Sequence, residues 1–293
     1  AQMSSLRASV IIVSFNTSNL TLRLIESLYR YEVGNQYELI VVDNASSDNS
    51  VSELKSKYPD IRLIANKKNL GFGKAVNQAS RIAEGEYIWL LNSDCRLKEP
   101  ILLKLIETLE HETSAFAVTP RTVNSSGRFH SSCRRFPTYD NIIFSRGSIL
   151  ARLPFFRHRQ VEYTLPDFPG TTRVEAISGT AMLMRKDEFI ASGGFDERFF
   201  MYLEDTDLCY RMYNKKRYCY YRPDAEVEHL NKASSRGRQG RRLYHHHMST
   251  LEYFLKWYPN YYLHNFLLVL LLTLNLFVKI ILINAGLLSD NDS

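Results

Sequence analysis

Short apolar runs alternate with stretches of helical periodicity over the first 120 residues of the chain. The runs are rich in Val, Ile and Leu, which is typical of strands that are buried on both faces. Between them, apolar residues recur every three to four positions, which predicts helices. Such alternation favours a mostly parallel sheet covered by helices. The predicted strands span residues 10–13, 39–42, 61–65 and 87–91, and the predicted helices span residues 19–28, 48–58, 73–83 and 100–109.

The pattern changes after residue 120. Residues 121–159 contain eight arginines and a single acid, Asp140, which we interpret as part of a basic insertion over residues 121–170. Strand character returns at residues 174–184, and a helix is predicted over residues 204–216. Two further helical stretches end the chain, and the second is strongly apolar. We therefore expect one α/β domain over residues 1–258 and a helical tail over residues 259–293.

Polar side chains follow three of the predicted strands. Ser14, Phe15 and Asn16 follow the first strand, Asp43 and Asn44 the second, and Asn92, Ser93 and Asp94 the fourth. Ligands of parallel α/β sheets bind at the carboxyl ends of the strands. An aspartate there can bind a nucleoside or, together with substrate phosphates, a divalent cation. The alternative is that Asp43, Asn44 and Asp48 form turns and helix caps and that Asp94 is a turn residue.

The segment from Asn69 to Lys74 contains a Gly-x-Gly motif at Gly71 and Gly73. A phosphate-binding P-loop requires Ser or Thr after the lysine, and here Ala75 follows it. A dinucleotide fingerprint requires a third glycine, at the position that Val76 occupies. The motif therefore indicates only a helix N-terminus that could lie near a phosphate group.

Carboxylates are concentrated among aromatic residues at positions 193–208, directly after Gly193-Gly194. Asp205 or Glu204, at the start of a helix, could act as a general base. The alternative is an acid-rich helix N-terminus that complements the helix dipole. His229 follows another short strand and could bind a metal or a phosphate, although a lone histidine is more often structural. The run His245-His246-His247 is interpreted as coincidental, because consecutive helical residues point in different directions.

Composition limits the classes of protein that the chain can represent. Of its 293 residues, 45% are hydrophobic and 23% are charged, values that exclude a fibrous or wholly disordered chain. The net charge of +6 is concentrated in residues 121–159 and 211–242, which leaves the remainder of the chain net negative. Two basic segments around an acidic centre suit diphosphates and lipid head groups better than a nucleic acid. The spacing of the four cysteines predicts neither a disulfide framework nor a zinc site.

The motifs together resemble those of family 2 glycosyltransferases. The resemblance rests on the order of 13-VSFN-16, 41-VVDNASSD-48, 69-NLGFG-73, 91-LNSD-94, 193-GGFDE-197 and 204-EDTDL-208, and covers residues 8–258. Within the family, the chain is most similar to bacterial rhamnosyltransferases of cell-surface polysaccharide assembly. The resemblance implies a GT-A fold, an inverting transfer reaction and a nucleotide-sugar donor.

The resemblance also implies roles for individual residues. Asp205 would be the catalytic base and Glu204 its support, and Asp94, with His229, would bind Mg2+ or Mn2+. Asn92 stands where the family usually has the first acid of an Asp-x-Asp motif, so Asp94 is the expected metal ligand. Gly179, Thr180 and Asp196 would shape the acceptor site. The donor would contact Ser14, Phe15, Asn16, Asp43, Asn44, Asn69, Gly71, Asn92, Ser93, Asp94 and Arg236.

Several alternatives remain open at this point. The favoured donor is dTDP-L-rhamnose, and the alternatives are a UDP-hexose or a UDP-N-acetylhexosamine. The acceptor would be a cell-surface glycan or a glycan on a polyprenyl diphosphate. A non-catalytic protein that binds nucleotide or nucleic acid is disfavoured, because acids gather at the expected sugar site and no aromatic–basic RNA signature is present.

The tail from Phe266 to Leu288 is long enough and apolar enough to span a bilayer, despite Lys279. It could instead lie on the membrane surface or form a homodimer. No secretory leader opens the sequence. We therefore expect the protein at the cytoplasmic face of the plasma or inner membrane.

Overall fold

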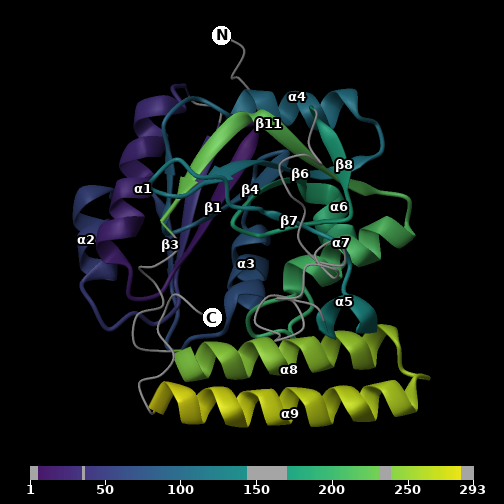
Figure 1. Ribbon diagram of the computed structural model, residues 1–293. Coiled ribbons are helices and arrows are strands. Elements are labelled where there is room, and N and C mark those ends of the chain that lie inside the picture. The colour runs from purple at the N-terminus through teal and green to yellow at the C-terminus, as the bar shows by residue number, and fades with distance from the viewer. Residues whose placement is uncertain (1–5, 35–36, 144–169, 231–238, 285–293) are drawn as a thin grey trace.

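The computed structural model describes residues 6–34, 37–143, 170–230 and 239–284. Its first half follows the predicted alternation, because each apolar run becomes a strand at the centre of the molecule (Figure 1). The elements of this half are β1 (Ala8–Ser14), α1 (Ser18–Tyr31), β2 (Tyr37–Asp43), α2 (Ser50–Lys57), β3 (Arg62–Ala65), α3 (Phe72–Ser80), β4 (Tyr87–Asn92), β5 (Cys95–Leu97) and α4 (Leu102–His111).

The second half adds strands to the same sheet and ends in two long helices. Its strands are β6 (Ala115–Val123), β7 (Cys133–Arg134), β8 (Thr172–Val174), β9 (Ala176–Ile177), β10 (Ala181–Arg185) and β11 (Tyr218–His229). Its helices are α5 (Tyr139–Ile143), α6 (Lys186–Ala191), α7 (Glu204–Asn214), α8 (Gln239–Trp257) and α9 (Tyr262–Asn284). Most of the expected basic insertion, and Arg236, lie outside the described residues.

The central sheet has the strand order β3-β2-β1-β4-β10-β6-β11-β5, and β8 pairs with β11. Strands β1 to β4 are parallel, so their carboxyl ends meet at one edge. Strand β10 is antiparallel to β4 and β6, and β5 is antiparallel to β11. The expected parallel arrangement therefore describes the amino-terminal half of the sheet, while both directions mix in the other half.

Successive residues of the strands face opposite sides, which gives the sheet two apolar faces. Val10 and Ile12 pack with α1, α2 and α4 on one side. Ile11 packs with α3, α6 and α7 on the other side. Each of the chain's four cysteines is a buried free thiol, as expected, and the sulfur atoms of Cys209 and Cys219 lie 3.4 Å apart.

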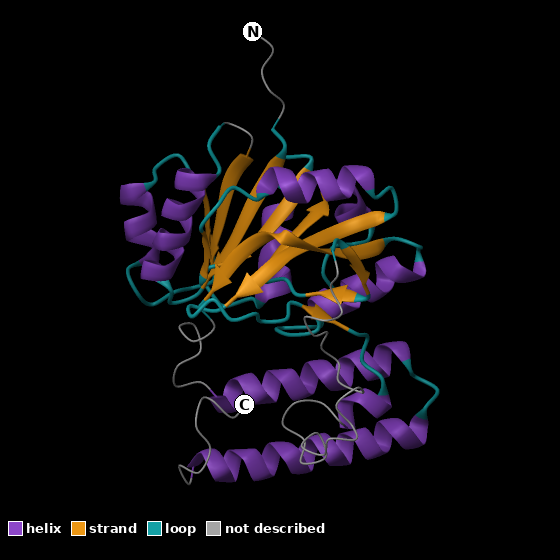
Figure 2. Ribbon diagram, turned by 45° about the horizontal axis from the view of Figure 1, so that its top comes forward, coloured by secondary structure: helices purple, strands orange, loops and turns teal. Residues whose placement is uncertain are grey.

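Helices α8 and α9 form a hairpin beside the α/β domain (Figure 2). Tyr253 and Phe254 of α8 and Leu268 of α9 pack with Phe199 and Leu203, which precede α7. The hairpin therefore contacts the domain next to the acid-rich segment.

The starts of α1 to α4 each differ from the prediction by one or two residues. Helix α1 begins at Ser18 rather than Asn19, and Asp48 accepts a hydrogen bond from the Ser18 amide at 3.2 Å. Asp48 also accepts one from the Ser50 amide at 3.0 Å, which confirms the turn-and-cap interpretation for this residue. Helix α4 begins at Leu102, after Pro100, because Glu32 from α1's end accepts hydrogen bonds from the amides of Ile101 and Leu102.

Candidate active site

The loops after β1 and β2 are locked together by side-chain hydrogen bonds. The Asn16 amide donates to Ser46 Oγ at 2.8 Å, and Asn16 Oδ1 accepts from the Ser47 amide at 2.7 Å. Asn16 has a left-handed backbone, with φ of 55°, which asparagine tolerates well. Asp43 is buried, and its Oδ2 accepts from the Ser46 amide at 2.9 Å. Within the described residues, Asp43 Oδ1 is buried without a hydrogen-bond partner.

Asn44 uses its side chain to hold the loop that precedes α3. Its Nδ2 donates to Asn69 Oδ1 and to the Gly71 carbonyl oxygen, each at 3.0 Å. Its Oδ1 accepts from the Leu70 amide at 3.1 Å and from Asn66 Nδ2 at 3.2 Å. The Asn44 amide group is therefore engaged by the protein itself and holds residues 66–71 in place.

Gly71 brings this loop against the acid-rich segment. Its φ is 87°, and a Cβ atom there would lie 2.3 Å from the Phe200 carbonyl oxygen. That same oxygen accepts a hydrogen bond from the Phe72 amide at 3.0 Å. Only glycine fits this close approach, which joins the start of α3 to the residues that precede α7.

Asp94 lies after β4 and pairs with His229 at the end of β11. Asp94 Oδ1 and His229 Nε2 are 3.0 Å apart, and both side chains are buried. Strands β5 and β11 fix this pair, because Cys95 stands opposite His229 in their register. In the described part of the chain, His229 Nδ1 has no hydrogen-bond partner.

Ser14 and Ser93 are joined by hydroxyl groups that the sequence did not single out. Thr17 Oγ1 lies 3.1 Å from Ser14 Oγ and donates to Ser93 Oγ at 3.0 Å. All three side chains are buried. Their hydrogen bonds link the end of β1 to the residues that follow β4. A threonine at the start of a helix gives no sequence signal for such a bridge.

Asp205 stands at the start of α7 and contacts the turn before β10. Its Oδ2 accepts from the Gly179 amide at 3.0 Å, and its Oδ1 accepts from the Thr206 amide at 2.6 Å. The Thr180 carbonyl oxygen accepts from the Asn92 amide at 2.9 Å. The turn at residues 179–180 therefore joins the end of β4 to the Asp205 carboxylate.

Glu204 has a different environment from its neighbour. Its side chain is 5% exposed, and among the described residues its Oε2 has no hydrogen-bond partner. Burial, together with the adjacent Asp205 charge, raises the pKa of Glu204 to about 8. At neutral pH the pair therefore presents one protonated acid beside Asp205.

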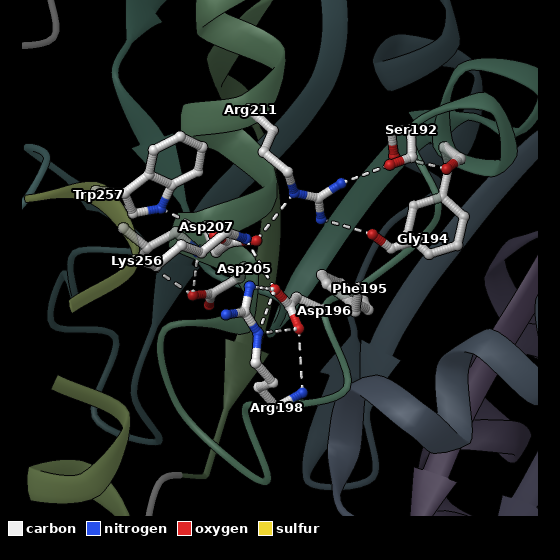
Figure 3. A network of polar contacts seen from close by, with 12 residues as sticks. Ser192, Gly194, Phe195, Asp196, Arg198, Asp205, Asp207, Arg211, Lys256 and Trp257 are labelled. Carbon is white, nitrogen blue, oxygen red and sulfur yellow. Dashed lines mark hydrogen bonds and ion pairs between the residues drawn. The ribbon is translucent and has the colours of Figure 1, made fainter. Parts of the chain in front are cut away.

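The Asp196 carboxylate is bound by two cations. Arg198 and Lys256 both contact its carboxylate, at 2.6 and 2.8 Å (Figure 3). Burial by itself would raise the pKa of Asp196, but these two cations outweigh burial and lower it. Asp196 also lines a cavity of about 530 Å³ with Arg211 and Lys256. Its expected acceptor role stays a prediction, as do the roles of the other site residues.

The side chain of Asn77 explains why glycine is required at Gly194, before Asp196. Asn77 donates to the Phe195 carbonyl oxygen and accepts from the Phe195 amide, each at 2.9 Å. A Cβ atom on Gly194 would lie 2.5 Å from Asn77 Oδ1, and Gly194 has a φ of 70°. The side chain of Asn77 thus fixes the turn, a function that its helical position did not reveal.

Comparison with known proteins identifies the relatives of this arrangement. The family model described as Glycosyl transferase family 2 matches residues 9–187. An N-acetylglucosaminyl-diphospho-decaprenol L-rhamnosyltransferase of Mycobacterium tuberculosis is 30% identical over 72% of this chain and 72% of its own length. The rhamnosyltransferase WbbL of Escherichia coli is 29% identical over 69% of this chain and 75% of its own.

Solved structures share the fold at low sequence identity. A mannosyltransferase from Pyrobaculum calidifontis, in complex with GDP-Man and Mn2+, has a TM-score of 0.56 and 17% identity, covering 87% of this chain and 64% of that one. S. aureus TarS residues 1–349, in complex with UDP, has a TM-score of 0.57 and 15% identity, covering 85% and 65%. These matches confirm the expected GT-A fold with a helical carboxyl-terminal part.

Proposed function

We propose, since this chain belongs to glycosyl transferase family 2, that it transfers L-rhamnose from dTDP-L-rhamnose to a lipid-linked glycan. One observation carries the proposal: the 179–180 turn binds the Asp205 carboxylate and also the end of β4, the strand that leads into the Asp94–His229 pair. The activities named for the two relatives support rhamnose as the sugar and a polyprenyl diphosphate as the acceptor's carrier.

Asp205 acts as the general base in this proposal. Its carboxylate takes the proton of the acceptor hydroxyl while that oxygen attacks the anomeric carbon and the nucleoside diphosphate leaves from the opposite face, which inverts the centre. The hydrogen bonds from Gly179 and Thr206 hold the carboxylate in one orientation. Glu204, kept protonated by burial, adds no second negative charge beside the base.

The nucleoside end of the donor binds at the loops after β1 and β2. The unpartnered Oδ1 of Asp43 is a buried acceptor, which suits a base edge or a ribose hydroxyl group. Asn44, Asn69 and Gly71 form the wall of this pocket through their mutual hydrogen bonds.

Asp94 and His229 fit a divalent cation. They provide an oxygen and a nitrogen donor 3.0 Å apart, and no group of three or more His, Cys, Asp or Glu suited to a metal ion occurs within the described residues. A cation held by so few side chains takes its remaining ligands from substrate phosphates and water, as Mg2+ commonly does. When bound, it supplies positive charge to the departing diphosphate.

Helix α9 supports contact with a membrane surface. Residues Tyr262–Ile283 are long and apolar enough to cross a membrane; their most apolar stretch of 18 residues has a mean hydropathy of 2.8, and 6% of that stretch is buried. Asn275 contacts His247 of α8 at 3.2 Å, and Asn265 contacts Tyr139 of α5 at 2.7 Å. Because these contacts hold α9 along the protein, we propose that it lies on the lipid surface, at the level of the lipid-linked acceptor.

A donor panel tests the proposed function. Purified protein with Mn2+ or Mg2+ and an N-acetylglucosaminyl-diphospho-lipid acceptor is offered dTDP-L-rhamnose, UDP-glucose, UDP-galactose or UDP-N-acetylglucosamine. We expect product from dTDP-L-rhamnose and a loss of about 10²–10⁴-fold in kcat for Asp205→Asn. Turnover with a UDP-sugar alone rejects the rhamnose donor. Wild-type turnover by Asp205→Asn rejects the assigned base.

A further inference from the structure

Helix α8 contacts the segment that precedes the base-bearing helix. Ser249 Oγ donates to the Met201 carbonyl oxygen at 2.8 Å. The His245 ring stacks on Phe200 with 4.5 Å between the ring centroids, and Arg242 Nε donates to Tyr202 Oη at 3.2 Å. Residues 200–202 are therefore held by three successive turns of α8.

The other end of α8 contacts the residues that follow the base. Lys256 Nζ lies 2.5 Å from Asp207 Oδ1 and 2.8 Å from Asp196 Oδ2. Trp257 Nε1 donates to Asp207 Oδ1 at 2.9 Å (Figure 3). Asp207 Oδ2 accepts from Arg211 Nε of its own helix at 2.9 Å. The Asp207 side chain is fully buried, so these side chains provide the hydrogen bonds that water would otherwise make to its carboxylate.

The held segment has an unfavourable backbone. Tyr202 and Leu203 have φ values of 72° and 64°, in the left-handed region that side chains of this size avoid. Such residues cost on the order of 1–3 kcal/mol each and persist where their surroundings hold them. The Leu203 carbonyl oxygen accepts from the Asp207 amide at 2.8 Å, so these two residues set the first turn of α7.

We propose that Lys256 is a positioning residue for the base: by binding Asp207 and Asp196 it fixes the first turn of α7 and hence the Asp205 carboxylate. This inference rests on the proposed function. Lys256 touches neither Asp205 nor the donor loops in any contact described above, so it acts through Asp207. If Lys256 is removed, Arg211 and Trp257 still bind the buried Asp207 carboxylate, so we expect the variant to fold.

Steady-state kinetics of Lys256→Met and Lys256→Arg test the inference. We expect Lys256→Met to lower kcat by about 10–100-fold, because a misplaced catalytic group loses rate at this scale. The KM for the nucleotide sugar should stay within about twofold, since the donor loops do not depend on Lys256, and Lys256→Arg should recover most of the lost kcat. The matched control is Lys104→Met, which removes another lysine with two oxygen partners, Glu99 and Asp224, and should leave kcat unchanged.

Hydrogen exchange provides a readout that does not need turnover. In Lys256→Met, the amides of residues 203–207 should exchange faster than in the wild type, while the amides of β1 and β2 should not change. A folded Lys256→Met with wild-type kcat, or with lower thermal stability as its sole change, overturns the positioning role. If the wild type turns over no donor, the proposed function fails, and the exchange rates alone then decide whether Lys256 fixes this turn.

Discussion

Glu204 and Asp205 are neighbours in the chain, yet their carboxyl groups have unlike surroundings. Asp205 is met by amide donors, whereas Glu204 is buried with an unpartnered oxygen atom. A carboxyl group in such a place keeps its proton in the folded protein and releases it on unfolding. The pair thus combines one neutral and one hydrogen-bonded acid at the start of the same helix.

The raised pKa of Glu204 makes the stability of the protein depend on pH. The pKa rises from 4.5 to about 8 on folding, so between these values the folded state retains a proton that the unfolded state has lost. The contribution of Glu204 to stability is therefore complete below pH 4.5 and is lost as the pH rises toward 8, by at most about 1.4 kcal/mol per pH unit.

Denaturant unfolding of Glu204→Gln from pH 5 to pH 8 checks this dependence. The free energy of unfolding of the variant should increase relative to the wild type as the pH rises. Exposed Glu26→Gln on α1 is the control and should run parallel to the wild type at every pH. A constant difference between Glu204→Gln and the wild type would falsify the proposed protonation.

A second prediction for single residues concerns Asn44. Its replacement by Ala leaves the Leu70 amide and the Gly71 carbonyl group without their side-chain partner, so the free energy of unfolding should fall by about 1–3 kcal/mol. Calorimetry with dTDP should also show weaker binding, because the loop at residues 66–71 loses the hydrogen bonds from Asn44 that fix its position. Exposed Asn49→Ala, whose side chain caps no helix, should change neither quantity. Unaltered stability in Asn44→Ala would contradict the structural role.

Many of the expected donor residues lie at or just after the carboxyl ends of β1, β2 and β4, because strand ends can be predicted from apolar runs. They did not reveal that Asn44 is engaged with Asn69 and Gly71, since a side chain's partners depend on loops that meet only in the folded chain. Thr17 and Asn77 were missed for the same reason: each acts on a residue distant in sequence.

Among the elements, strands β1 to β4 and their helices could be predicted because their burial follows a regular period. The antiparallel direction of β10 could not, since an apolar run carries no information on the direction of its neighbours. The last helix begins at Tyr262, within the expected helical tail over residues 259–293, so its first turn precedes the apolar run that starts at Phe266.

At the level of the elements, the prediction concerns the exposed apolar face of α9 and its binding to lipid. Leu274 and Phe277 are 62% and 64% exposed, and Asn265, Leu268 and Asn275 face the protein instead. Burying a side chain of this size in an apolar phase is worth roughly 1.5–3 kcal/mol. The double variant Leu274→Glu and Phe277→Glu should therefore weaken binding to anionic phospholipid vesicles by at least about tenfold, as measured by flotation.

Leu103→Glu provides the control for α9. Leu103 is 56% exposed on α4, on the α/β domain, so its variant should float with the vesicles as the wild type does. If the wild type does not bind vesicles but forms a stable dimer that the double variant disrupts, α9 covers a second copy of the chain and the membrane proposal is wrong.

On the scale of the whole molecule, the proposed site is built from parts that are distant in the sequence. Asp43 and Asp94 come from the first half, and Asp205 and His229 from the second, while Lys256 of α8 contacts α7 from outside the sheet. The order of the motifs predicts these residues for the site, and their roles stay a prediction. The network of Lys256, Asp207 and Trp257 could not be predicted, because it depends on how the terminal hairpin packs on the domain.

The placement of β11 has a consequence for how the chain folds. Asp94 meets His229 only when β11 has inserted between β6 and β5, and this pairing closes a loop of more than a hundred residues. Loops of that length close slowly relative to local helices and neighbouring strands. On refolding, helical content and the β1–β4 core should therefore return first. The proposed binding of a nucleoside diphosphate with a divalent cation should return last, so its rate of recovery would report the final step of folding.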